Sequence, residues 1–303
     1  MAMSSVRTGS LEIRHLLAQI GIERFFADYW LKRAVSFDLE PDFFARLCEE
    51  IGPLDISRLV GLANGGTQAW VANEHIAHSV VSVTSSNARQ FFDAGASLYF
   101  VNVPMNAITR PLSAFLGAPP ERMLASFFLT PGGGGASRHF DAHENFTVQL
   151  TGAKRWTLGE TAFVVAPPEG YVFGSHVPAS LVDMLDERNE TSRRSVDLKP
   201  GTLLYIPRGT LHETEAGEMS WSLNLSYGCT MWIDLVCAGL RRHLIKSERW
   251  RGTVTGLKNA DPASQVANMM PQLIDELRMM LADPKEIDLL CLEFFRSYDS
   301  RPK

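Results

Sequence analysis

Cysteine is scarce in this chain, and its few copies stand far apart. The 303 residues contain four cysteines, at positions 48, 229, 237 and 291, and no two of them form a Cys-x-x-Cys pair. Zinc knuckles and disulfide-stapled folds both need cysteines at closer, paired spacings. The sequence therefore predicts neither kind of site, and we expect a protein of the reducing cytoplasm.

Excess positive charge and long apolar runs are also missing. Lys and Arg number 29 against 34 Asp and Glu, which gives a formal net charge of -5. Proteins that grip nucleic acid through its phosphates are usually basic, so nucleic acid is not an expected partner. No stretch approaches the ~18 consecutive apolar residues of a membrane span, and residues 1–10 lack the apolar core of a signal peptide. We expect neither membrane insertion nor export.

What the sequence does have is an average globular composition and a change of pattern along its length. Residues 1–97 begin with helical patterns, of which 41–51 starts at a proline and ends before Gly52. Short apolar or alternating runs, split by Gly and Pro, fill residues 98–228, as in a barrel or jelly roll. Residues 229–303 return to helical spacing. We therefore predict an α+β protein in which helical N-terminal and C-terminal regions flank a double-stranded β-helix (jelly-roll) core. The predicted strands are 98–103, 123–130, 146–150, 154–158, 202–207 and 221–227.

Two histidines and an aspartate in the strand-rich region have the spacing of a metal site. His139 and Asp141 are two residues apart, so on a strand their side chains lie on one face and can bind one metal ion. His-x-Asp alone is weak evidence, because such pairs also arise by chance. His212 supplies a third ligand, since it comes just after a strand that begins at the Pro200-Gly201 turn and stops at Pro207. Two histidines and one carboxylate form the facial triad of non-haem Fe(II) oxygenases.

A lysine that is predicted to face the interior indicates an anionic ligand. The strand patterns on either side of Gly152 are typical of a β-hairpin with a three-residue loop. Lys154, Trp156 and Leu158 then share one face, which is apolar apart from the lysine. An ammonium group that points inward needs an anionic partner, and a dicarboxylate cosubstrate would supply one.

Residues 127–228 resemble the JmjC-type, cupin-fold Fe(II)/2-oxoglutarate oxygenases, especially the ribosomal oxygenases and the asparaginyl hydroxylase of the hypoxia-inducible factor. In that family, His-x-Asp is followed by a phenylalanine strand that ends in Gln, and then by a segment similar to Gly-Lys-Arg-Trp. This chain repeats the pattern with the same spacing, in Asn145-Phe146 to Gln149 and in Gly152 to Trp156.

The resemblance implies Fe(II), 2-oxoglutarate and O2 as the cofactor and cosubstrates. The iron ligands would be the same two histidines and aspartate that their spacing selects. Lys154 would pair with the far carboxylate of 2-oxoglutarate, and Asn145 and Asn224 match positions near its iron-chelating end. A second anchor for the far carboxylate stays open, because Ala136 stands where the asparaginyl hydroxylase has a threonine. The alternatives in this chain are Thr130 and Tyr99.

The function that the resemblance implies is hydroxylation of a protein or peptide side chain, coupled to the conversion of 2-oxoglutarate to succinate and CO2. Asp141 favours hydroxylation over halogenation, because related halogenases replace this carboxylate with a small residue. Three alternatives stay open: an oxygenase of a free amino acid or other small molecule, an N-methyl demethylase, and a non-catalytic cupin-like binding protein. Lys154 argues against the last of these, because a buried lysine without an anion costs roughly several kcal/mol.

Three further features lead to expectations about partners. His143 shares a face with Asp141, and we expect it to contact substrate or support the ligands, since a fourth ligand would occupy a position that the cosubstrate or oxygen needs. The insert 159–198 carries seven acidic residues against three arginines, so it is a candidate wall of a groove for a basic polypeptide. The helical patterns after residue 228, including 265–281 and 286–298, are rich in Leu and Met. The resemblance to ribosomal oxygenases implies that they form a homodimer.

Overall fold

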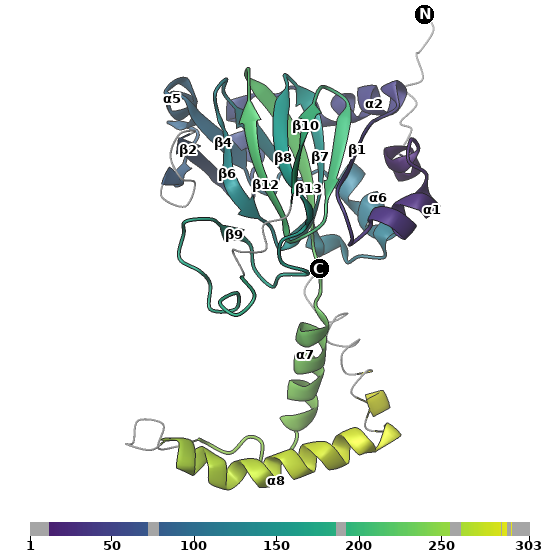
Figure 1. Ribbon diagram of the computed structural model, residues 1–303, viewed down its shortest axis with the longest axis vertical. Coiled ribbons are helices and arrows are strands. Elements are labelled where there is room, and N and C mark those ends of the chain that lie inside the picture. Colours follow the sequence, from purple (N-terminus) through teal and green to yellow (C-terminus); the bar gives the residue numbers. More distant parts are fainter. Residues whose placement is uncertain are drawn as a thin grey trace, which may run out of the picture. The chain divides into compact units, whose positions relative to one another are not determined.

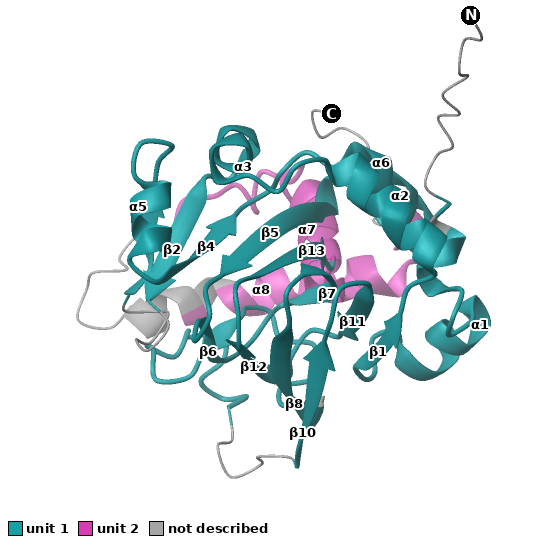
Figure 2. Ribbon diagram, turned by 90° about the horizontal axis from the view of Figure 1, so that it is seen from above, with its two compact units in different colours: residues 1–229 teal, residues 230–303 magenta. Residues whose placement is uncertain are grey.

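The chain divides into two compact units, residues 1–229 and residues 230–303 (Figure 2). The computed structural model describes residues 12–71, 79–185, 192–254, 262–285, 287–289 and 292. None of the helices in these ranges combines the length and the apolar composition that crossing a bilayer requires.

Two antiparallel β-sheets build the first unit (Figure 1). The larger sheet has eight strands in the order β1-β11-β7-β13-β5-β4-β2-β3, and the smaller has five in the order β10-β8-β12-β6-β9. The strands of the larger sheet are β1 Val35–Asp38, β2 Thr67–Val71, β3 Val81–Val83, β4 Ala96–Phe100, β5 Met123–Thr130, β7 His143–Thr151, β11 Thr202–Ile206 and β13 Ser220–Gly228. Those of the smaller sheet are β6 Gly135–Phe140, β8 Lys154–Ala162, β9 Tyr171–Val172, β10 Arg193–Leu198 and β12 Thr210–Ala216.

From β5 to β8, and again from β10 to β13, successive strands alternate between the two sheets. This alternation is the arrangement of a jelly roll. It also shows that the predicted hairpin around Gly152 is wrong, because β7 pairs with β11 and β13 while β8 pairs with β10 and β12. The short turn instead carries the chain from one sheet to the other. Gly152 has φ +65°, and a Cβ atom there would lie 2.2 Å from the Met219 carbonyl oxygen, so this turn requires glycine.

The N-terminal region contains the expected helices but also strands that the sequence did not indicate. Its helices are η1 Ile13–Leu17, α1 Ile22–Arg24, η2 Phe25–Tyr29, α2 Pro41–Ile51, α3 Ile56–Leu62 and α5 Ala88–Asp93. Two further helices, α6 Asn106–Leu116 and η3 Pro120–Arg122, lie within residues 98–228, where the sequence indicated only strands. The predicted helix 41–51 coincides with α2, which buries Phe43, Leu47 and Ile51 at helical spacing and ends at Gly52 with φ +71°. β1 pairs with β11, and β2 pairs with β4, so residues 1–97 extend the larger sheet.

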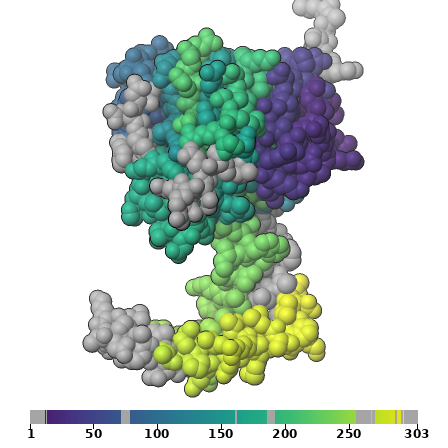
Figure 3. Space-filling model, viewed as in Figure 1, coloured from purple at the N-terminus to yellow at the C-terminus, as the bar shows by residue number. Residues whose placement is uncertain are grey.

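The N-terminal helices pack on one face of the larger sheet. The Phe25 ring contacts Tyr205 and Phe146, with centroid distances of 5.0 Å and 5.9 Å. In the space-filling view, the purple N-terminal residues lie directly beside the green and teal strands (Figure 3). Along β7, Phe146, Val148 and Leu150 belong to this helix-covered core. The alternate residues of β7 are buried on the opposite face, and they are polar: Asn145, Thr147 and Gln149.

The second unit contains α7 Trp232–Leu244 and α8 Pro262–Ala282. The prediction of a helix over 265–281 is confirmed by α8, whereas most of the predicted helix 286–298 lies outside the described residues. α7 leaves large apolar side chains exposed, with Trp232 at 81%, Ile233 at 60% and Val236 at 41% of their full accessible area.

Candidate functional site

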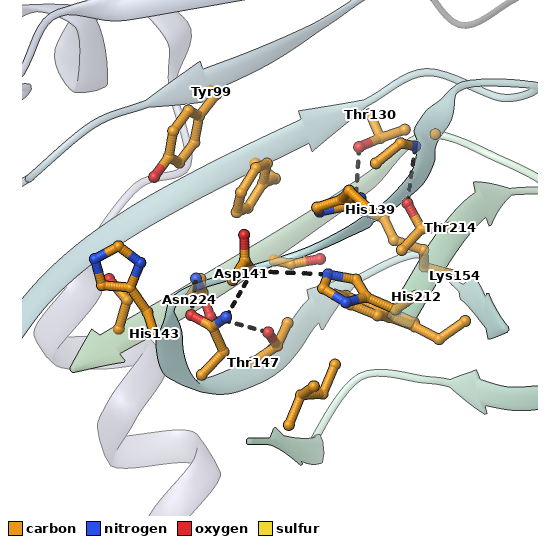
Figure 4. Close-up of a pocket in the computed structure, with 18 of the residues that line it drawn as sticks. Tyr99, Thr130, His139, Asp141, His143, Thr147, Lys154, His212, Thr214 and Asn224 are labelled. Carbon is orange, nitrogen blue, oxygen red and sulfur yellow. Dashed lines mark hydrogen bonds and ion pairs between the residues drawn. The ribbon is translucent and has the colours of Figure 1, made fainter. Parts of the chain in front are cut away.

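His139, Asp141 and His212 come together between the two sheets (Figure 4). His139 lies in β6 and His212 in β12, and the antiparallel pairing of these strands places the two residues directly opposite one another. Asp141 follows β6 by one residue. His212 was expected just past a strand end, but it is the third residue of a strand of its own, which the sequence reading missed. That strand starts after the turn at Gly209, which has φ +81°.

The three side chains have the geometry of a metal site. Their potential ligand atoms all lie within 4.8 Å of one another, and His212 Nε2 is 3.7 Å from Asp141 Oδ2. His139 Nδ1 lies 2.6 Å from the Ser137 carbonyl oxygen, and His212 Nδ1 lies 2.9 Å from the Thr210 carbonyl oxygen. A carbonyl oxygen only accepts, so each Nδ1 carries the proton and each Nε2 keeps its lone pair. Backbone partners of this kind orient histidines that bind metals.

The charge states of these groups also suit a metal ion. Burial and the neighbouring His139 ring lower the pKa of His212 to about 4, and Asp141 offsets this only in part. Burial would by itself raise the pKa of Asp141, but the imidazoles of His139, His212 and His143 and the Asn145 amide outweigh it and lower this pKa. A neutral imidazole and an ionised carboxylate are the forms that bind metals. The donor set, two imidazole nitrogens and a carboxylate, therefore fits a divalent transition metal.

Lys154 points into the same space from β8 and is buried, as the face that it shares with Trp156 and Leu158 predicted. Its Nζ donates a 3.0 Å hydrogen bond to Thr130 Oγ1 and lies 5.8 Å from the centre of the Phe128 ring. Burial lowers the pKa of Lys154 to about 7. No carboxylate pairs with it within the described part of the chain, so this end of the cavity can take an anion from outside.

The two alternatives for a second anion anchor are placed differently. Thr130 accepts the hydrogen bond from Lys154 Nζ. Tyr99 instead stacks on Phe128, with ring centroids 4.4 Å apart, and burial raises the pKa of its hydroxyl. In Figure 4, the Tyr99 hydroxyl points toward the His143 side of the cavity and away from Lys154. The geometry thus favours Thr130 as the partner of Lys154.

Asn145 and Asn224 connect to the metal cluster through hydrogen bonds (Figure 4). Asn145 Nδ2 donates to Asp141 Oδ2 at 2.7 Å, and Asn224 Nδ2 donates to Asn145 Oδ1 at 3.1 Å. Thr147 Oγ1 in turn donates to Asn224 Oδ1 at 3.0 Å. We call these three residues, with Asp141, the amide relay. It belongs to the polar inward faces of β7 and β13.

The cavity around these groups has a volume of about 300 Å³. Trp156 covers one side of the cluster, because its ring stacks on His212 with centroids 5.4 Å apart. Trp70 and Leu124 contribute apolar wall, and the exposed side chain of His143 also lines the cavity. The insert 159–198 contributes Val172 of β9. The acidic residues of this insert at positions 186, 187 and 190 lie outside the described residues, so its charge preference stays a prediction.

Several lining residues escaped the sequence reading. They are small polar side chains on β7, β12 and β13: Thr147, Thr214, Ser222 and Ser226. A signal for them was present, because Asn145-x-Thr147-x-Gln149 and Ser222-x-Asn224-x-Ser226 alternate polar with large apolar residues. In a strand with core on one side, such alternation usually indicates a solvent face. Here it indicates a cavity.

Comparison with known proteins places this geometry in a family. Residues 108–234, which include β5 to β13 and all three residues of the metal cluster, match the JmjC domain. These residues form a JmjC domain. The jelly-roll core that the sequence predicts is thereby confirmed.

The chain has relatives that match well beyond this domain. It is 28% identical to the uncharacterized protein YxbC of Bacillus subtilis (strain 168), over 98% of this chain and 94% of that protein. It is 26% identical to the ribosomal protein uL16 3-hydroxylase of Escherichia coli (strain K12), but that match covers only 59% of this chain and 44% of the hydroxylase. Among solved structures, YcfD, a ribosomal oxygenase from Escherichia coli in complex with cobalt and 2-oxoglutarate, has a TM-score of 0.55 at 19% identity, over 90% of this chain and 70% of that one. That likeness shows a common fold.

Proposed function

We propose that this JmjC protein is an Fe(II)- and 2-oxoglutarate-dependent dioxygenase that hydroxylates a polypeptide side chain. The observation that carries the proposal is the cluster of His139, Asp141 and His212, with both Nε2 atoms directed away from their backbone partners. The names of two relatives add support, one a ribosomal protein hydroxylase and the other a ribosomal oxygenase that binds cobalt and 2-oxoglutarate.

In this proposal, each polar group of the cavity has one task. His139, Asp141 and His212 hold Fe(II), while Lys154 and Thr130 bind the far carboxylate of 2-oxoglutarate. When bound together, Fe(II), 2-oxoglutarate and O2 supply the oxidising power to hydroxylate a C–H bond, with release of succinate and CO2. The remaining residues position these partners and keep water away. Trp156 and Phe128 do the latter, because their rings border His212 and Lys154.

Asn224 lies on the metal side of the cavity, opposite the Lys154 end (Figure 4), and Asn145 is hydrogen-bonded both to Asn224 and to Asp141 of the metal cluster. In the amide relay, each side-chain amide uses one of its N–H groups. The second N–H of each is then left to donate to the oxygen atoms at the chelating end of 2-oxoglutarate.

The direct test is turnover. The protein, with Fe(II), 2-oxoglutarate and O2, is incubated with a lysate or with peptides of ribosomal proteins, and succinate is measured together with the mass of each polypeptide. We expect succinate release that rises with polypeptide and a polypeptide heavier by one oxygen atom. Stimulation by free amino acids alone would instead make the protein a small-molecule oxygenase, and loss of a methyl group would make it a demethylase. Absence of any succinate would refute the dioxygenase assignment.

We also propose that the protein is a homodimer and works in the cytoplasm. The dimer proposal is supported by the exposed apolar residues of α7, because side chains as large as Trp232 are seldom left in water without a partner. The location is supported by the cysteines within the described ranges, Cys48, Cys229 and Cys237, which are all unbridged thiols.

A further inference from the structure

The amide relay has a direction that its chemistry fixes. A carboxylate bound to a metal has no hydrogen to donate, so Asn145 must present its NH2 group to Asp141. The carbonyl oxygen of Asn145 then faces Asn224 and must receive an N–H. The carbonyl oxygen of Asn224 consequently faces Thr147, and only a hydroxyl that donates satisfies it. Each step follows from the one before, so the orientation of both amides is determined by the two ends of the relay.

Thr147 is the far end of this relay and lies apart from the metal cluster. It is the strand partner of Asn224 across β7 and β13, and its side chain is 2% exposed. An amide can rotate so that its oxygen and nitrogen exchange places, and each hydrogen bond that distinguishes the two ends holds it in one orientation. Removing the Thr147 hydroxyl removes the partner that holds the oxygen of Asn224 in place. The Asn224 oxygen is then a buried acceptor without a donor, and this cost is relieved only if Asn224 shifts or turns, which weakens the N–H contact that holds Asn145 against Asp141.

We infer that Thr147 is a positioning residue for the metal centre, which acts through Asn224 and Asn145 to hold the carboxylate of Asp141 in the orientation that binds metal. The inference rests on the proposed function, because it takes Asp141 as a metal ligand. It goes beyond that function by assigning a task to a threonine that touches neither the metal cluster nor Lys154.

The test measures Co(II) binding to the full chain by titration, with the visible absorption of bound Co(II) as a report of ligand geometry. Thr147→Val keeps the shape of the side chain and removes the hydroxyl, whereas Thr147→Ser keeps the hydroxyl. Loss of a direct partner of a metal ligand typically costs about 10–100-fold in metal affinity. Thr147 is two hydrogen bonds further from the metal than Asn145, the direct partner of Asp141. We therefore expect Thr147→Val to weaken Co(II) binding by a smaller factor, about threefold to tenfold, and to change the absorption bands. We expect Thr147→Ser to restore both.

A matched control separates this role from a general effect of losing a buried hydroxyl. Thr67 lies in β2 of the same sheet, is 3% exposed, and its hydroxyl has no hydrogen-bond partner among the described residues. Thr67→Val should leave Co(II) affinity unchanged. The path is tested by a double-mutant cycle, in which Thr147→Val should have no further effect once Asn224 is Ala. If Thr147→Val does not fold, Thr147→Ala takes its place in the same cycle.

The outcomes separate this inference from the proposed function. Wild-type Co(II) affinity in the Thr147→Val protein, no rescue by serine, or additive effects of the Thr147 and Asn224 changes would each overturn it. A wild-type chain that does not bind Co(II) would overturn it as well. A chain that binds Co(II) with the expected coupling but releases no succinate would support the relay and remove the dioxygenase proposal instead.

Discussion

At the scale of single residues, Lys154 is expected to favour ligand binding but to lower the stability of the ligand-free protein. Its ammonium group is buried between the sheets, where Thr130 Oγ1 accepts its hydrogen bond, and burial lowers its pKa to about 7 from the ordinary 10.5. An unfolded chain binds the proton more tightly than the folded one, so this lysine destabilises the ligand-free protein. The penalty is complete below about pH 7 and disappears as the pH rises toward 10.5. A bound dicarboxylate would remove it by pairing with the charge.

Replacing Lys154 with Met is therefore expected to stabilise the protein when 2-oxoglutarate is absent. The gain at neutral pH should reach about 3–5 kcal/mol, and it should shrink at pH 9 because the wild-type lysine is then largely neutral. Denaturant unfolding of both proteins at the two pH values measures this gain in stability. A gain that is equal at both pH values would contradict the assignment of a charged, buried lysine.

The same Lys154→Met variant should need about 100-fold more 2-oxoglutarate for half-maximal turnover, with metal binding nearly unchanged.

A second prediction at this scale is that metal binding depends on His212. His212→Ala removes a nitrogen ligand, for which water is a poor substitute, and should abolish both Co(II) binding and succinate formation in a folded protein. His143→Ala is the comparison, because this histidine lines the cavity but lies outside the metal cluster. It should retain Co(II) binding. Titration calorimetry with Co(II) and circular dichroism of each variant decide the matter, and normal turnover by His212→Ala would remove the oxygenase interpretation.

At the scale of elements, the turns that carry the chain between sheets place the site residues. Gly152 separates β7, which carries Asn145, from β8, which carries Lys154. Its backbone has φ +65°, and the Met219 carbonyl leaves no room for a side chain. Gly117, at the end of α6, has nearly the same φ, +63°, but no atom lies within 4 Å of a Cβ there. The two positions share nearly the same φ and differ in crowding.

Alanine substitutions at Gly152 and Gly117 can be compared, because φ is nearly the same at the two positions. Gly117→Ala should cost about 1 kcal/mol of stability, from the left-handed backbone alone. Gly152→Ala should cost about 1–3 kcal/mol more, because the methyl group displaces β8 or β13. It should also weaken 2-oxoglutarate binding, since the displaced strand carries Lys154. Thermal unfolding and 2-oxoglutarate titration of both variants measure the difference, and equal losses would show that the turn does not position the lysine.

Elements with local signals could be predicted from the sequence, and elements defined by distant partners could not. α2 was predictable because its proline, its glycine and its apolar spacing all lie within the helix or next to it. β1 and β3 are four and three residues long and exist only through pairing with β11 and β2, so no local period marks them. His139 was identified from its spacing to Asp141, and His212 from its place after a predicted strand. Their closeness depends on the register of β6 with β12, which no nearby residue encodes.

At the scale of the whole molecule, the second unit leaves apolar residues of α7 exposed, and a second copy of the chain is the proposed cover. Light scattering over micromolar concentrations should give twice the 33.6 kDa mass of the chain. Replacing Trp232 and Val236 with Glu should return the particle to a monomer, because two charges then replace apolar contact area. Iron-dependent turnover of 2-oxoglutarate should persist in that variant, as the metal cluster belongs to the first unit. A wild-type particle of 33.6 kDa would contradict the dimer.

One face of β7 lines the cavity and the other packs in the core, and this limits how the protein can change over evolution. Asn145 and Thr147 line the cavity, and the alternate residues Phe146 and Val148 belong to the core that the N-terminal helices cover. An inserted or deleted codon within the strand would exchange the two sets at once. New specificity can therefore arise along this strand only through substitutions, one position at a time, while insertions are confined to connections such as the one between β8 and β10.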